Sequence, residues 1–155
     1  MTPANKDFLH KAFVAAQAAQ HAFPEMAACE AALESGYGHS QLASQDNNLF
    51  GMKEHLHPLY ETVSLPTREF LSNEWKTINS NWIVYPDWAA CFADRMETLK
   101  RLAPNFVHYR LALAASSAEE YVRQVSMTWA TDPNRSLKVL AIYDAVAGDW
   151  DATGS

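Results

Sequence analysis

The chain has 155 residues, of which 48% are hydrophobic, and a formal net charge of −6. This length and composition predict a single domain over residues 1–155 with a hydrophobic core. No basic run could follow a phosphate backbone, and no apolar stretch is long enough to cross a bilayer. We therefore expect no nucleic-acid partner and no membrane insertion, and we expect a monomer.

The N-terminal segment does not have the pattern of a secretory signal. Asp7 lies where a signal peptide would begin its apolar region, and no cleavage pattern follows. If the protein acts outside the cytoplasm, we expect another export route. A holin, a secretion machine or a longer exported parent protein would each supply one.

Hydrophobic residues recur at helical spacing through most of the chain, which predicts about seven helices. Asn5 and Ser117 are candidate helix caps, and Pro24 and Pro86 suit first helical turns. In chain order, we expect helices between residues 5 and 24, from about 25 to 35, over 40–45, between 86 and 104, over 106–115, from 117 to 129 and from about 137 to 148. Residues 149–155 are expected to form a loose tail.

Residues 60–85 have a different character, because β-branched and aromatic residues are frequent there. Ser72-Asn73-Glu74 is a turn signal, so we expect a β-hairpin or two to three short strands. Glu69 lies in this segment. A glutamate on a strand is most often a surface residue.

Residues 31–43 form the stretch around which the chain is organised. A run of small apolar residues ends at Glu34, and Gly36 and Gly38 break the helix directly afterwards. The turn leaves space in front of the carboxylate, which suits an acid that acts on a bulky substrate; a solvated surface role is the alternative. Glu30 shares this helical face four residues earlier, and two like charges there are unfavourable unless one is protonated or paired.

The remaining chemistry-bearing residues do not predict a metal or cofactor site. Cys29 and Cys91 lie on the apolar sides of predicted helices, so we expect buried free thiols. His55 and His57 could supply two metal ligands, but no third ligand follows at a zinc-site spacing. No dinucleotide-binding or nucleophile-elbow motif is complete. We therefore expect neither a metal nor a cofactor.

Two carboxylates stand out, Glu34 at a helix end and Glu69 on the predicted hairpin. Glycoside hydrolysis uses such a pair: an acid protonates the leaving oxygen, and a second carboxylate activates water or acts as nucleophile. Four aromatic residues in the hairpin or in loops could stack on sugar rings or pack in the ordinary way. They are Phe50, Trp75, Trp82 and Trp129.

Several motifs resemble those of glycoside hydrolase family 73, the bacterial cell-wall glucosaminidases found in autolysins, phage lysins and the flagellar rod-cap protein. Residues 33–43 (LESGYGHSQLA) and 48–53 (NLFGMK) resemble its LESGWGxSxLA and NLFGIK motifs. Residues 67–70 (TREF) resemble its TxEY motif, and residues 129–140 (WATDPNRSLKVL) resemble its YATDPxYxxKL segment. The resemblance runs from about residue 8 to residue 143.

The resemblance implies an α+β, mostly α, lysozyme-like fold with a helical lobe, a small β-hairpin lobe and a peptidoglycan cleft between them. It assigns Glu34 as the general acid. Glu69 would activate water, or position it while the 2-acetamido group of the substrate attacks. The substrate-binding positions that it implies are Phe50, Trp129, Tyr37, Asn48 and Tyr85. Trp129 stands where the family usually has Tyr, and Glu30 stands where Gln is common.

The implied function is that of a peptidoglycan endo-β-N-acetylglucosaminidase, whose partner is the glycan strand. It would act on the bacterial cell wall, in the periplasm or outside the cell. A muramidase or lytic transglycosylase acting on the same polymer is one alternative. A non-catalytic glycan-binding domain is another, because Trp129 departs from the family pattern.

Overall fold

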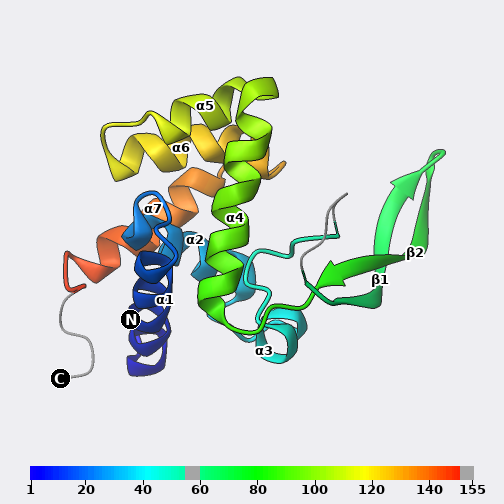
Figure 1. Ribbon diagram of the computed structural model, residues 1–155, viewed down its shortest axis with the longest axis horizontal. Helices are drawn as coiled ribbons and strands as arrows, with labels where there is room; N and C mark the ends of the chain where they lie inside the picture. The colour runs from blue at the N-terminus through cyan, green and yellow to red at the C-terminus, as the bar shows by residue number, and fades with distance from the viewer. Residues whose placement is uncertain (55–59, 151–155) are drawn as a thin grey trace.

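The structure, a computed structural model, describes residues 1–54 and 60–150. A helical body carries a two-stranded hairpin, which projects on the side away from both termini (Figure 1). The elements in these ranges are α1 (Pro3–Ala18), α2 (Pro24–Ser35), α3 (Gln41–Asp46), β1 (Thr62–Leu71), β2 (Glu74–Ile83), α4 (Trp88–Leu102), the 3-10 helix η1 (Ala103–Asn105), α5 (Val107–Leu113), α6 (Ala118–Trp129) and α7 (Arg135–Val146). This arrangement confirms the predicted mostly helical fold with a small hairpin lobe.

Helix α2 lies at the centre of the helical body. It packs against α1, α6 and α7, and α1 packs in turn against α4. Alanines fill most of its middle, and the residues from Met26 to Ala32 are all fully buried. Small side chains allow neighbouring helices to approach closely, so this composition explains the central position of α2.

The helix caps follow the sequence signals with three differences. Helix α4 begins at Trp88 with Asp87 as its cap, so Pro86 precedes the helix and does not lie in its first turn as predicted. The first helix begins at Pro3 with Thr2 as its cap, so the predicted cap at Asn5 is wrong; the Asn5 amide instead donates to Thr2 Oγ1 (3.1 Å). Ser117 caps α6 as predicted, accepting from the Glu120 amide (3.1 Å). The Glu120 carboxylate, however, accepts from the Ser116 amide rather than from that of Ser117.

The segment from residue 62 to residue 83 is one antiparallel hairpin rather than three strands. Ser72 and Asn73 form its two-residue turn, with φ of 52° and 64°. Positive φ at both positions matches the twist of the flanking strands and is typical of a tight hairpin. Ile83 is buried at the base, whereas Trp75 near the tip is 62% exposed.

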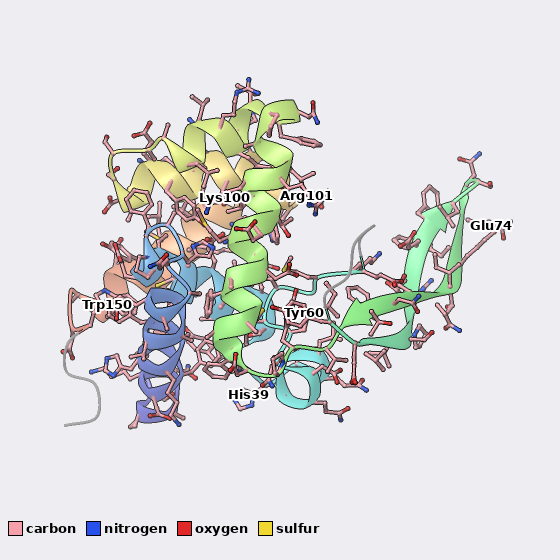
Figure 2. The ribbon with its side chains drawn as sticks, viewed as in Figure 1. His39, Tyr60, Glu74, Lys100, Arg101 and Trp150 are labelled. Atoms are coloured by element: carbon pink, nitrogen blue, oxygen red, sulfur yellow. The ribbon has the colours of Figure 1, made fainter. Side chains whose placement is uncertain are left out.

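The C-terminal segment is better anchored than the sequence predicts. Trp150 is buried and packs against Phe13 and Tyr143, with ring centroids 5.2 and 6.4 Å away (Figure 2). His10 Nε2 donates to the Asp149 carbonyl (2.9 Å). The predicted loose tail therefore does not include residues 149 and 150, and the rest of it lies outside the described residues.

The two cysteines are buried and free, as predicted. Burial raises the pKa of both thiols, that of Cys91 to about 12. No helix in the described part of the chain is long and apolar enough to cross a membrane. His55 and His57, the two candidate metal ligands, lie outside the described residues.

Candidate active site

Glu34 lies in the last turn of α2, where two glycines and a buried serine fix the following turn. Gly36 ends the helix in the left-handed conformation (φ 57°). Gly38 has φ of 85°, and a Cβ there would lie 3.1 Å from the Phe8 ring, so both conformation and space favour glycine. Ser35 Oγ accepts from the Gly38 amide (2.9 Å) and donates to the Ala31 carbonyl (2.6 Å). The backbone after Glu34 is therefore held in place.

Glu34 lines two adjoining cavities of about 330 and 370 Å³. The first lies toward the hairpin and is lined by Ser40, Gln41, Leu42, Asn48, Leu65, Pro66 and Trp82. The second lies toward the helices and is lined by Phe50, Met52, Lys53, Thr98, Arg101, Tyr109 and Trp129. Both also include Gly51, so they form two parts of one groove that meet at Glu34. Among the described residues that line them, Glu34 is the only carboxylate.

A buried cluster of charges lies directly behind Glu34. Glu30, fully buried, accepts two hydrogen bonds from Arg95, Nη1 to Oε1 (3.0 Å) and Nη2 to Oε2 (2.7 Å). The Tyr121 hydroxyl also donates to Glu30 Oε1 (2.6 Å). His21 completes the cluster: its Nδ1 donates to the Ala22 carbonyl (2.7 Å), and its Nε2 accepts from Arg95 Nη1 (3.2 Å).

Arg135, the first residue of α7, joins this cluster to Glu34. Its Nη2 donates to Glu30 Oε2 (2.7 Å), and its Nε donates to Glu34 Oε1 (2.9 Å). Its Nη1 donates to Ser126 Oγ (2.8 Å). The like charges of Glu30 and Glu34 are thus paired through one guanidinium. Only 24% of the Glu34 side-chain surface is exposed, and no described residue binds Glu34 Oε2.

The electrostatics of the cluster follow from its burial and its ion pairs. Burial favours neutral Glu30, but the charges of Arg95 and Arg135 hold its pKa well below its ordinary value. Burial likewise opposes the charges on Arg95 and Arg135. The negative charge of Glu30 nevertheless raises the pKa of both arginines above the ordinary value. Burial and then the charge of Arg95 lower the pKa of His21 to about 4. The native cluster therefore contains an ionised Glu30, two cationic arginines and a neutral His21.

Phe50 and Trp129 enclose the Arg95 guanidinium. Its carbon lies 4.6 Å from the Phe50 ring centroid and 4.3 Å from the Trp129 ring centroid. Both aromatic residues also line the second cavity. The sequence left open whether they stack on sugar or pack in the core. In the structure they pack on a buried cation while they border the groove.

Glu69 faces the same side of the hairpin as Leu65, because alternate β1 residues from Val63 to Glu69 are the more buried ones. Leu65 lines the first cavity beside Glu34. Glu69 itself is not among the residues that line either cavity, and it is ion-paired with Lys53 (3.0 Å). The structure therefore brings Glu69 to the groove side of the hairpin but does not place it beside Glu34.

Asn48 borders the first cavity, but its amide group is committed to the backbone. It donates to the Met52 and Ile83 carbonyls (both 2.9 Å) and accepts from the Met52 amide (2.9 Å). It therefore ties the loop to the base of β2. The two predicted tyrosines, Tyr37 and Tyr85, line neither cavity.

The contacts of these tyrosines explain their positions. Tyr85 is 1% exposed and its hydroxyl donates to Asp94 (2.5 Å), which leaves no surface for a glycan strand. Burial, and then this hydrogen bond, raise the Tyr85 pKa. Tyr37 packs edge-on against Phe8, with ring centroids 5.9 Å apart.

A sequence model of glucosaminidases, described as mannosyl-glycoprotein endo-beta-N-acetylglucosaminidase, matches residues 10–147. The chain belongs to this family. This confirms the resemblance to glycoside hydrolase family 73 and identifies the chain as a member of a glycoside hydrolase family.

Curated relatives and solved structures agree with this family. The exo-glucosaminidase LytG of Bacillus subtilis (strain 168) is 29% identical over 126 residues, which cover 80% of this chain and 44% of LytG. A probable N-acetylmuramidase of Lactococcus lactis subsp. lactis (strain IL1403) is 32% identical over 116 residues, covering 72% of this chain and 26% of that protein. The chain thus spans less than half the length of these curated relatives.

The structural matches cover almost the whole chain. The catalytic domain of the autolysin Auto from Listeria monocytogenes has a TM-score of 0.83 at 22% identity, covering 97% of this chain and 89% of that domain. A C-terminally truncated glycoside hydrolase domain of FlgJ from Salmonella typhimurium has a TM-score of 0.71 at 25% identity, with 92% and 97% covered. The lysozyme-like fold expected for the glucosaminidase family is confirmed.

Sequence reasoning missed the roles of four residues in this member of the glucosaminidase family: Arg95, Arg135, Tyr121 and His21. Arg95 falls on the apolar stripe of α4, where an unpaired charge would be costly, so a buried carboxylate partner could have been inferred. Arg135 stands where the family segment YATDPxYxxKL has its second tyrosine. The replacement of this tyrosine by arginine could have indicated a special role for residue 135. It does not show that Glu30 and Glu34 are the partners of Arg135.

We predict that this glucosaminidase domain loses stability as the pH falls from 6.5 toward 4. Because the native pKa of His21 is about 4 against an ordinary value of 6.5, the unfolded chain binds the additional proton in this range. The expected loss in the free energy of unfolding is about 3 kcal/mol by linkage. Urea unfolding at several pH values measures it.

His21→Gln, which can still accept from Arg95 but does not titrate, should flatten this slope. His39→Gln is the matched control, because His39 is exposed on the turn after α2 (Figure 2), and it should keep the wild-type slope. Glu30 also contributes to the pH dependence of stability, because its pKa is lowered in the native state. The stability that it contributes is lost only below about pH 4.5, where the unfolded chain begins to bind the proton. An unchanged slope in His21→Gln would contradict the assignment.

Proposed function

We propose that this chain is an endo-β-N-acetylglucosaminidase that hydrolyses β-1,4 bonds in the glycan strand of peptidoglycan. The observation that carries the proposal is the position of Glu34 where two cavities meet. A carboxylate at the middle of a groove can act on an internal bond, because sugar units have space on both sides. This favours an endo-acting enzyme over one that removes terminal sugars.

The lining of the groove suits an amphipathic sugar chain. Trp82 and Leu65 offer apolar surface in the first cavity, and Phe50 and Trp129 border the second. Sugar rings present apolar faces to aromatic side chains and hydroxyl groups to polar ones. Trp75, the other candidate stacking residue, is exposed near the hairpin tip and lines neither cavity.

Glu34 is the proposed general acid. Arg135 holds its Oε1, so Oε2 is the oxygen available to the substrate. In the reaction, Glu34 gives its proton to the glycosidic oxygen as the bond from that oxygen to C1 breaks. The electron pair of that bond stays with the leaving oxygen, and Glu34 becomes a carboxylate.

Glu69 is the proposed assistant for water attack. It lies four residues along β1 from Leu65, which corresponds to about 13 Å of strand. To act at the groove, Glu69 would have to leave Lys53, and the hairpin would have to approach α2. Either direct activation of water or support of a substrate-assisted step by the 2-acetamido group fits this placement.

Two other functions have specific support. One curated relative is named a probable N-acetylmuramidase, so a muramidase or a lytic transglycosylase on the same strand is the second candidate. A non-catalytic glycan-binding domain is the third, because Trp129, which lines the groove, departs from the family tyrosine and stacks on Arg95. These candidates differ in whether the strand is cut and at which sugar.

The proposed place of action is the bacterial cell wall, in the periplasm or outside the cell. Holin-dependent release, a secretion machine or a longer exported parent protein would deliver the domain. We also propose that the domain acts as a monomer, with the glycan strand as its partner.

Glu34→Gln should abolish the release of reducing ends from purified peptidoglycan, with a loss of about 100-fold or more in kcat. The amide oxygen can still accept from Arg135, so the fold should be retained and circular dichroism should match wild type. Glu97→Gln is the control, because that side chain is 74% exposed on α4. Wild-type activity in Glu34→Gln would overturn the role of Glu34.

Glu69→Gln should lower kcat at least about tenfold with little change in KM, because it removes a base but little binding surface. Glu74→Gln is the matched control on the same hairpin, at its exposed tip (Figure 2). Initial rates over a range of peptidoglycan concentrations separate the two constants. Equal kcat values for Glu69→Gln and the control would remove Glu69 from the mechanism.

A further inference from the structure

Each nitrogen of the Arg135 side chain donates a hydrogen bond inside the protein, and the side chain lines neither cavity. It is 2% exposed, and each of its three nitrogens donates to a different residue. Two of the acceptors are the carboxylates Glu30 and Glu34, and the third is Ser126. A guanidinium can span two carboxylates in this way because its donors point in fixed, divergent directions. Glu34 is therefore oriented by a buried cation rather than by solvent.

Four formal charges balance in this part of the molecule when Glu34 is ionised. Glu30 and Glu34 are negative, and Arg95 and Arg135 are positive. Arg135 carries the charge that pairs with Glu34, because Arg95 is engaged by Glu30.

The other titratable groups that surround the cluster do not change this balance. His21, between α1 and α2, and Tyr121 on α6 are neutral, since burial is the largest influence on the pKa of each. Burial also raises the pKa of Tyr109 on α5 and keeps it neutral. On the groove side, Lys53 is paired with Glu69, and Arg101 extends from the side of α4 that faces the hairpin (Figure 2).

We propose that Arg135 is a positioning residue that holds Glu34 Oε1 and so aims Oε2 at the groove, while Glu30 and Ser126 fix the orientation of its guanidinium. The inference rests on the proposed role of Glu34 as general acid. When that proton passes to the glycosidic oxygen, the new carboxylate finds Arg135 Nε already in place. Such preorganised stabilisation lowers the barrier without reorganisation during the reaction.

Two isosteric changes should lower kcat with little change in KM, because Glu34 would lose its orientation while the groove keeps its lining. Arg135→Gln removes the donor that holds Glu34 Oε1, so its kcat should fall about tenfold or more. Glu30→Gln removes the carboxylate acceptor that anchors Arg135 Nη2, so its kcat should fall less. A merely structural role would lower the stability of the fold without this split between kcat and KM.

Arg135→Lys is the conservative variant. It keeps the charge, so it should retain more activity than Arg135→Gln. Its kcat should still lie below that of wild type, because one ammonium cannot hold Glu30, Glu34 and Ser126 together. Lys138→Gln is the matched control for lost charge on the same helix; Lys138 pairs with Asp132 on the surface, so kcat and KM should not change.

Thermal unfolding of each variant shows whether it is folded at the assay temperature. If Arg135→Gln does not fold, Arg135→Lys carries the test, and a wild-type kcat in that variant overturns the inference. A higher KM with an unchanged kcat in the folded variants also overturns it. An active Glu34→Gln would instead refute the proposed function.

Discussion

The buried ion pairs of Glu30 with Arg95 and Arg135 are the interaction on which the rest of the structure depends. They join α2, α4 and α7 at one point, and Tyr121 adds α6. Removing one partner from such a cluster leaves an uncompensated charge and typically costs about 3–5 kcal/mol. The helical packing and the ionisation of these groups therefore depend on each other.

The same cluster connects the core to the groove by two routes. Arg135 reaches Glu34 by a direct hydrogen bond. Arg95 reaches the second cavity through Phe50 and Trp129, which cover its guanidinium and border the groove. A tryptophan at position 129 has a large ring with which to cover a buried cation. Its departure from the family tyrosine thus has a structural reason in this chain.

Local patterns predicted most of the fold, because helical periodicity, caps and the hairpin turn are encoded within a few residues. The turn at Ser72 and Asn73 and the cap at Ser117 are examples. The anchoring of Trp150 was not predictable, because it depends on Phe13, which is distant in the sequence.

The site was predictable only in part, for the same reason. The motifs pointed to Glu34, and the structure places it at the centre of the groove. Its contact with Arg135 spans 101 residues and has no local signal. Tyr85 was expected to bind substrate, but only the fold reveals that Asp94 accepts a hydrogen bond from its hydroxyl inside the core. Sequence motifs identify residues that a family shares, whereas burial decides which of them can contact substrate.

The central claim is that Glu34 cuts a glycan strand beside N-acetylglucosamine. Mass spectrometry of the soluble fragments from peptidoglycan digested by the wild-type domain tests it most directly. The account predicts new reducing ends on N-acetylglucosamine. Reducing ends on N-acetylmuramic acid, anhydro-N-acetylmuramic acid ends, or binding without any cleavage would contradict it.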